Sequence, residues 1–118
     1  MKRRIHTISF KHAWDGVWYA VTTQPNFQVH TLASFAVIFS ARHFEVSRTE
    51  WAILLFAIAL VLVAEMLNTA IESVTDILIL EFNKHAKIAK DVAAGMVLLS
   101  VVLAVIVGLV IFLPYLFL

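Results

Sequence analysis

The sequence predicts an all-α membrane protein with an N-terminal amphipathic surface helix and three transmembrane helices. Hydrophobic residues make up 62% of the 118 residues, and the mean hydropathy is +0.92, which is more apolar surface than a soluble domain of this size can bury. Long apolar stretches alternate with short polar connections, as in a chain that crosses a bilayer several times. The formal net charge of +1 gives no indication of a nucleic-acid partner.

Residues 1–24 are expected to form a helix that lies in the membrane interface. Apolar residues recur at helical spacing from Phe10 through Trp14 and Trp18, with Lys11 toward the other face. Basic residues beside tryptophan are typical of an interfacial helix. A soluble helix packed on a core would show the same pattern, but the rest of the chain is too apolar to favour that alternative.

Three membrane helices are expected after Pro25, which disfavours a helical residue before it and so separates them from the surface helix. We expect these helices at residues 27–42, 51–76 and 91–115, all within one domain, 1–118. Ser47 and Glu50 have the spacing of a capping box that opens the second of them. A polar connection, 81–90, is expected before the third.

Within the third expected helix, small residues recur every four positions, a spacing that favours close packing of membrane helices. They are Ser100, Ala104 and Gly108.

Basic residues predict the orientation in the membrane. The N-terminal arm and the connection 81–90 together hold seven lysines and arginines, whereas the connection between the first two spans holds only Arg42 and Arg48. Because cytoplasmic segments carry the excess of basic residues, the N-terminus is expected in the cytoplasm and the C-terminus outside.

The second expected span ends in a stripe of polar residues. At 100° per residue, Glu65, Asn68, Glu72 and Asp76 fall at about 0°, 300°, 340° and 20° on a helical wheel, so they share one face. A carboxylate deep in a bilayer costs roughly 2.5 kcal/mol or more. The stripe therefore indicates a cation, a partner or a proton-transfer role, although charged residues near helix ends also pair simply to satisfy one another.

An antiparallel arrangement of the last two spans would bring this stripe close to Lys87, Lys90 and Asp91. Carboxylates, an amide and lysines together can bind a divalent metal and the phosphates that it neutralises. The chain has only three glycines and no GxxxxGK[ST] sequence, so no glycine-rich loop is available to bind a nucleotide. Any phosphoryl transfer would have to use side chains on membrane helices.

The sequence resembles the small bacterial lipid kinases that phosphorylate diacylglycerol or undecaprenol. The resemblance is specific in two segments, EMLNTAIESVTD at 65–76 and AKIAKDVAAG at 86–95, and looser in FKHAWDG at 10–16 and QPNFQVH at 24–30. It implies magnesium-dependent transfer of the ATP γ-phosphate to the hydroxyl of a membrane lipid, undecaprenol or diacylglycerol. It also implies a homotrimer with shared sites in the bacterial inner membrane.

The same resemblance implies roles for individual residues. By position, Glu65 resembles the general base of the family, and Asn68 lies in the same motif, where it would orient the reacting groups. Glu72 resembles a metal ligand that also belongs to the nucleotide site. The residues matching nucleotide-binding positions are Asp76, Lys90 and Asp91.

One position departs from the family pattern. Gln24 stands where many members have a second metal-binding glutamate, and a neutral amide oxygen is a weaker magnesium ligand than a carboxylate. Gln24 is therefore expected at the metal with reduced affinity. The Asn26-x-x-x-His30 pattern is closer to the undecaprenol-preferring branch.

Two alternatives to an active lipid kinase remain open. A catalytically weak or inactive relative with a structural role in the membrane would explain Gln24. A cation-coupled transporter could use the same acidic stripe, but three spans lack the inverted repeats common in such proteins. The sequence does not choose between the two lipid alcohols.

Overall fold

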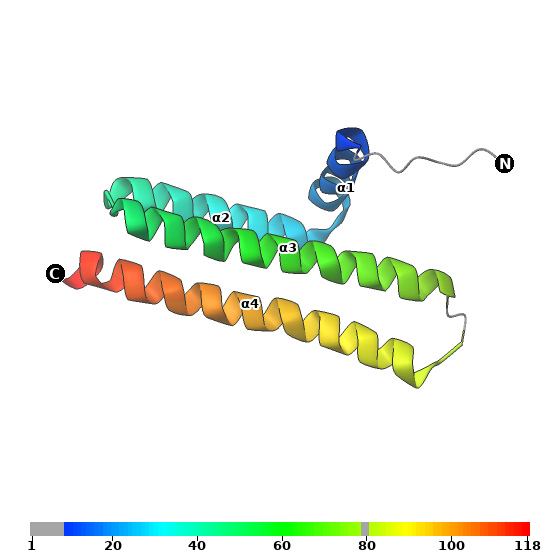
Figure 1. Ribbon diagram of the computed structural model, residues 1–118. Coiled ribbons are helices and arrows are strands. Elements are labelled where there is room, and N and C mark those ends of the chain that lie inside the picture. The colour runs from blue at the N-terminus through cyan, green and yellow to red at the C-terminus, as the bar shows by residue number, and fades with distance from the viewer. Residues whose placement is uncertain (1–8, 79–80) are drawn as a thin grey trace.

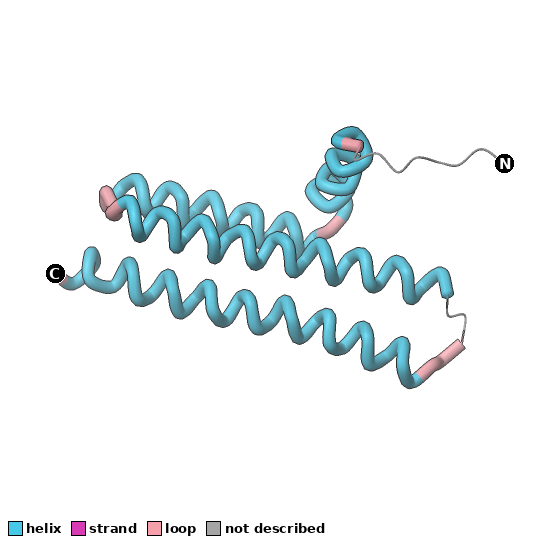
Figure 2. The backbone as a smooth tube through the Cα atoms, viewed as in Figure 1, coloured by secondary structure: helices cyan, strands magenta, loops and turns pink. Residues whose placement is uncertain are grey.

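The computed structural model describes residues 9–78 and 81–118, and within these ranges the chain is helical apart from short turns, with no β-strand. The helices are α1 (Phe10–Thr23), α2 (Pro25–His43), α3 (Arg48–Leu78) and α4 (Lys84–Phe117). In Figure 1, α3 lies between α2 and α4, and α1 turns away from these three. Figure 2 shows how short the described turns between the helices are. The all-α class is confirmed.

Of the helices in the described ranges, α3 and α4 are long and apolar enough to cross a membrane. They contain 31 and 34 residues, with apolar windows of mean hydropathy 2.3 and 3.2. Large apolar side chains such as Phe56 and Val110 point outward from them, as expected of surfaces that face lipid or further protein. The first expected span is present as α2, but α2 does not reach the same apolar content. Its passage through the membrane therefore stays a prediction.

Helix α1 forms the expected amphipathic helix from Phe10 onward. The side chain of Ser9 caps it by accepting a hydrogen bond from the backbone N–H of His12. Its apolar face does not pack on the rest of the chain, since Phe10 and Trp14 are 85% and 63% exposed. Such a face suits a membrane interface. The first eight residues of the expected surface helix, 1–8, lie outside the described residues.

The capping box at the start of α3 is confirmed. The Ser47 hydroxyl accepts a hydrogen bond from the backbone N–H of Glu50 at 3.1 Å, and the Glu50 carboxylate accepts one from the backbone N–H of Ser47 at 3.0 Å. The hydroxyl of Tyr115, near the C-terminus of α4, also donates to Glu50 at 2.5 Å. One carboxylate thus joins the first turn of α3 to the last turns of α4.

A small apolar core lies at this same end of the molecule, where the turn between α2 and α3 meets the C-terminal part of α4. Partly buried aromatic residues, including Phe44 and Phe112, pack against it. The core holds α2, α3 and α4 together at this end. Its buried members are Ala41, Val46, Leu54 and Ile111.

Helix α4 begins earlier than the sequence predicted. The segment 81–90 was expected to be a connection, but α4 already begins at Lys84. The side chain of Asn83 accepts hydrogen bonds from the backbone N–H groups of His85 and Ala86, which satisfies donors that a helix start leaves open. The three lysines of this segment therefore lie on a helix.

Within a single chain, the small-residue face packs closely at Ser100 but not at Gly108, and packing of this face between copies stays a prediction. Ser100 is buried, and its hydroxyl donates to the backbone carbonyl of Val97 in its own helix. However, nothing lies within 4 Å of the position that a Cβ on Gly108 would occupy. Ala104 and Gly108 instead line a groove between α2, α3 and α4.

Candidate functional site

The polar stripe of α3 passes from a buried to an exposed environment. Glu65 and Asn68 are only 3% and 7% exposed, because α3 packs against its neighbours at this level. Glu72 and Asp76 lie further along the helix and are exposed. At 1.5 Å per residue, the stripe from Glu65 to Asp76 extends about 16 Å along the helix axis. The two ends of the stripe therefore have different surroundings.

At the buried end, the carboxylate of Glu65 faces the imidazole of His30 on α2. Glu65 Oε2 and His30 Nε2 are 3.8 Å apart, which is ion-pair range for a protonated imidazole but longer than a hydrogen bond. Asn68 lies one turn further along α3, and its Oδ1 atom has no hydrogen-bond partner among the described residues. A buried amide oxygen without a partner beside a buried carboxylate is typical of a site that receives another polar group.

At the exposed end, a polar pocket of about 390 Å³ brings together Asp76, Lys90 and Asp91, three of the four residues expected at the nucleotide, whereas Glu72 does not line it. Lys90 donates a hydrogen bond to Asp76 at 2.5 Å, across the gap between α4 and α3. Lys87 donates to Asp91 at 2.5 Å along α4. The expected approach of the acidic stripe to the lysines is confirmed for the pair Asp76 and Lys90.

Glu72 lies between these two ends, and its negative charge acts on the ammonium group of Lys90 more weakly than that of Asp76. Gln24 lies at the junction of α1 and α2. Helices α2 and α3 run antiparallel and meet at His30 and Glu65. From His30, six residues lead back along α2 to Gln24, about 9 Å. From Glu65, seven residues lead forward along α3 to Glu72, about 10 Å, and in the same direction. Gln24 and Glu72 thus belong to the same level of the bundle.

The residues present fit a metal that is bound mainly through phosphate. Within the described residues, no three His, Asp or Glu side chains gather closely enough to hold a metal ion by themselves. Magnesium commonly takes only one or two carboxylates, with phosphate oxygens and water completing its coordination. An exposed Glu72 near a lysine suits this arrangement better than a closed protein cage.

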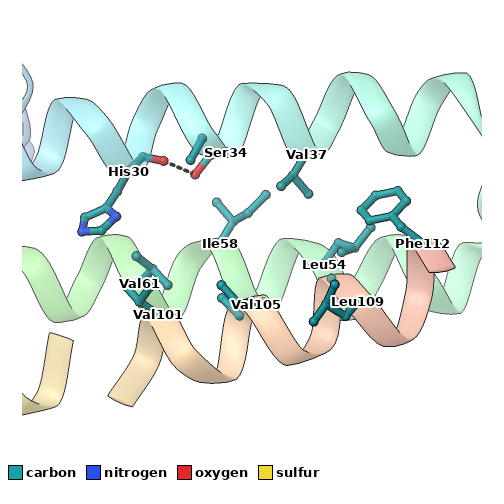
Figure 3. Close-up of a pocket in the computed structure, with 14 residues that line it drawn as sticks. His30, Ser34, Val37, Leu54, Ile58, Val61, Val101, Val105, Leu109 and Phe112 are labelled. Carbon is teal, nitrogen blue, oxygen red and sulfur yellow. Dashed lines mark hydrogen bonds between the residues drawn. The ribbon is translucent and has the colours of Figure 1, made fainter. Parts of the chain in front are cut away.

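An apolar groove of about 370 Å³ runs along α2, α3 and α4. Figure 3 shows His30 at one end of it and Phe112 at the other, with the His30 side chain extending from α2 toward α3. The buried carboxylate of Glu65 therefore has its partner at the end of an apolar surface. Between these ends the lining includes Ala33, Val37, Leu54, Ala57, Ile58, Val61, Val101, Val105 and Leu109.

The whole stripe was expected to approach the lysines of α4, but this expectation is wrong for Glu65. Glu65 lies eleven residues before Asp76, at a level where the basic side chain within 4 Å of it is His30 of α2. His30 was noted only as part of a pattern and was not assigned to the site. Its signal was present, because an ionisable side chain within a membrane helix requires a partner.

Comparison with known proteins identifies relatives over nearly the whole chain. The family described as prokaryotic diacylglycerol kinase matches residues 11–112. A diacylglycerol kinase from Synechocystis is 46% identical over 108 residues, which cover 91% of this chain and 62% of that protein. An undecaprenol kinase from Bacillus subtilis is 43% identical over 106 residues, 90% of this chain and 86% of that protein. A diacylglycerol kinase from Escherichia coli is 28% identical over 95 residues, 80% and 78% of the two chains.

Proposed function

Because the chain belongs to the prokaryotic diacylglycerol kinase family, a family of lipid kinases, we propose that it transfers the γ-phosphate of ATP to the hydroxyl of a membrane lipid alcohol, in the presence of magnesium. The observation that carries this proposal is the stripe on α3. It joins a buried carboxylate, and an amide oxygen that has no partner among the described residues, to an exposed pocket that contains Lys90. Transfer from ATP to a lipid requires one end of the site that is shielded from water, for the lipid hydroxyl, and one end that is exposed to solvent, for the phosphates of ATP.

The reaction assigns a separate role to each part of the stripe. Glu65 takes the proton of the lipid hydroxyl, and the hydroxyl oxygen forms a bond to the γ-phosphorus. The bond from the γ-phosphorus to the bridging oxygen breaks, and ADP leaves with that electron pair. Asn68 orients the reacting groups through its amide. The products are a lipid phosphate, ADP and a proton.

The exposed end binds the nucleotide. Lys90 neutralises phosphate charge. Asp76 and Asp91, on either side of the pocket, orient the Lys90 side chain and the nucleotide. Glu72 and Gln24, which lie at the same level of the bundle, would hold magnesium together with the phosphates. When bound, magnesium supplies electrostatic stabilisation of the charge on the transferring group.

We place the site at the cytoplasmic face of the bacterial inner membrane. The lysines on the first turns of α4 favour the cytoplasmic side for this end of the bundle, and therefore for the N-terminus. Helix α2 has 19 residues, which is about 28 Å of helix and close to the thickness of a bilayer core, so we infer three spans. The outward-facing apolar surfaces of α3 and α4 leave room for further copies, consistent with a homotrimer.

The test is a lipid phosphorylation assay with purified protein in lipid vesicles. Undecaprenol and diacylglycerol are supplied side by side, each with ATP, with and without magnesium. We expect a phosphorylated lipid and ADP in equal amounts, only when magnesium is present. The Asn26-x-x-x-His30 pattern favours undecaprenol, whereas the names of the two most similar relatives reported above, a diacylglycerol kinase and an undecaprenol kinase, do not distinguish the two alcohols. No lipid phosphate with either alcohol would instead support an inactive structural relative, and ion flux without ATP consumption would support a transporter.

Replacing Gln24 with glutamate tests the metal assignment. A carboxylate binds magnesium more tightly than an amide oxygen, so the magnesium concentration at half-maximal activity is expected to fall about 10-fold, in the range seen when metal surroundings are altered. The measurement is a magnesium titration of initial rate at saturating ATP. Thr23→Ser, at the neighbouring position, is the control and should not move the titration. An unchanged magnesium requirement in the Gln24 variant would show that this side chain does not reach the metal.

A further inference from the structure

The pair formed by His30 and Glu65 is the one contact within 4 Å between a basic and an acidic side chain at the buried level of the described bundle. The side chain of Glu65 is 4% exposed and that of His30 is 20% exposed. The other ion pairs of the described residues, Lys87 with Asp91 and Lys90 with Asp76, lie at the exposed end. Neither of them can compensate the charge of Glu65.

A buried carboxylate with no compensating group is strongly unfavourable. Among the described residues no hydrogen bond to the Glu65 carboxylate is found, and the imidazole of His30 is the basic group within 4 Å of it. Neighbouring polar groups on α2 do not compete for this role. The hydroxyls of Thr31 and Ser34 each donate to a backbone carbonyl of their own helix. On α4, the groove facing His30 is lined by apolar residues such as Val101.

We propose that His30 is a positioning residue for Glu65: its imidazole, 3.8 Å away, favours the orientation in which the buried carboxylate faces α2 at the end of the apolar groove. This rests on the proposed function, in which Glu65 receives the hydroxyl proton. The separation of 3.8 Å leaves the carboxylate oxygen without a tight hydrogen bond to His30. Glu65 is therefore oriented without its proton-accepting capacity being used up.

The first test compares His30→Leu with His30→Gln. Leucine fills a similar volume without an N–H group, whereas the glutamine amide can present an N–H near the position of Nε2. We expect His30→Leu to lower kcat about 10- to 100-fold, the range typical of groups that orient another functional residue. The KM for ATP should stay unchanged, because the nucleotide pocket lies at the other end of the stripe. His30→Gln should recover most of the lost kcat.

Thr31→Val is the matched control, because it changes the adjacent residue of the same helix while keeping its shape, and Thr31 contacts only its own helix through its hydroxyl. It should leave kcat unchanged. If His30→Leu behaves like Thr31→Val, or if His30→Gln loses as much kcat as His30→Leu, the proposal is overturned.

A second test does not depend on enzyme activity. His30→Leu is made in the parent protein and in a Glu65→Gln background, and the Tm of each is measured in the same detergent. Because leucine leaves a buried charge uncompensated only when Glu65 is present, we expect a larger fall in Tm in the parent than in the Glu65→Gln background. Equal falls would contradict the pairing. If the parent phosphorylates no lipid, the proposed function fails, whereas this comparison still decides whether His30 holds Glu65.

Discussion

Glu65→Gln is expected to lower lipid phosphorylation about 10²- to 10⁴-fold, the range contributed by a general base. Glutamine preserves the shape of the buried side chain but cannot take the proton of the lipid hydroxyl. Since the position is 3% exposed and is filled by an almost identical volume, the fold should survive. The measurement is the steady-state rate of lipid phosphate formation, with oligomeric state and helical content recorded on the same sample.

Glu45→Gln is a matched control for this substitution. Glu45 is an exposed carboxylate in the turn between α2 and α3, at the opposite end of the bundle from the nucleotide pocket. It should retain the rate of the parent protein. A rate close to normal for Glu65→Gln would remove Glu65 from the role of base and leave proton transfer to another group or to water.

Glu72→Gln is expected to reduce the rate about 100-fold or more at low magnesium concentration, because several kcal/mol of transition-state stabilisation depend on the bound ion. Glu72 is exposed and near Lys90, so its removal should raise the magnesium concentration needed for half-maximal rate without altering the KM for the lipid. The measurement is a magnesium titration of initial rate, paired with nucleotide binding measured by calorimetry.

Glu65→Gln and Glu72→Gln should therefore respond differently to added magnesium. Excess magnesium should restore part of the rate to Glu72→Gln and none to Glu65→Gln. If the two variants lost activity equally at every magnesium concentration, Glu72 would belong to the proton-transfer step or to the fold, and the metal assignment would have to change.

Local signals in the sequence were sufficient to predict where several of the helices lie. The spacing of Ser47 and Glu50 predicted the helix start that their reciprocal hydrogen bonds confirm. The spacing of tryptophans predicted α1. The start of α4 at Lys84 was also readable, because Asn83 is a good capping residue, but the lysines that follow were interpreted as a solvated connection.

Contacts between helices were harder to predict because they depend on register. A helical wheel gives the direction of Glu65 and Asp76 but not the depth at which a neighbouring helix offers a partner. Asp76 meets Lys90, whereas Glu65 meets His30 on a different helix. Likewise, the spacing of Ser100, Ala104 and Gly108 predicts one helical face, but it does not tell whether that face closes against a neighbouring helix or lines a groove, as it does at Ala104 and Gly108.

The hydrogen bond from Tyr115 to Glu50 has a consequence for the opposite end of the molecule. The chain itself tethers α3 to α4 beyond Leu78, and this side-chain contact tethers them again about a full bilayer away. Separating the two helices at that end requires this hydrogen bond to break, at a cost of about 1 kcal/mol. In the proposed kinase, release of ADP from the pocket around Lys90 would therefore favour rotation of side chains over separation of α3 from α4.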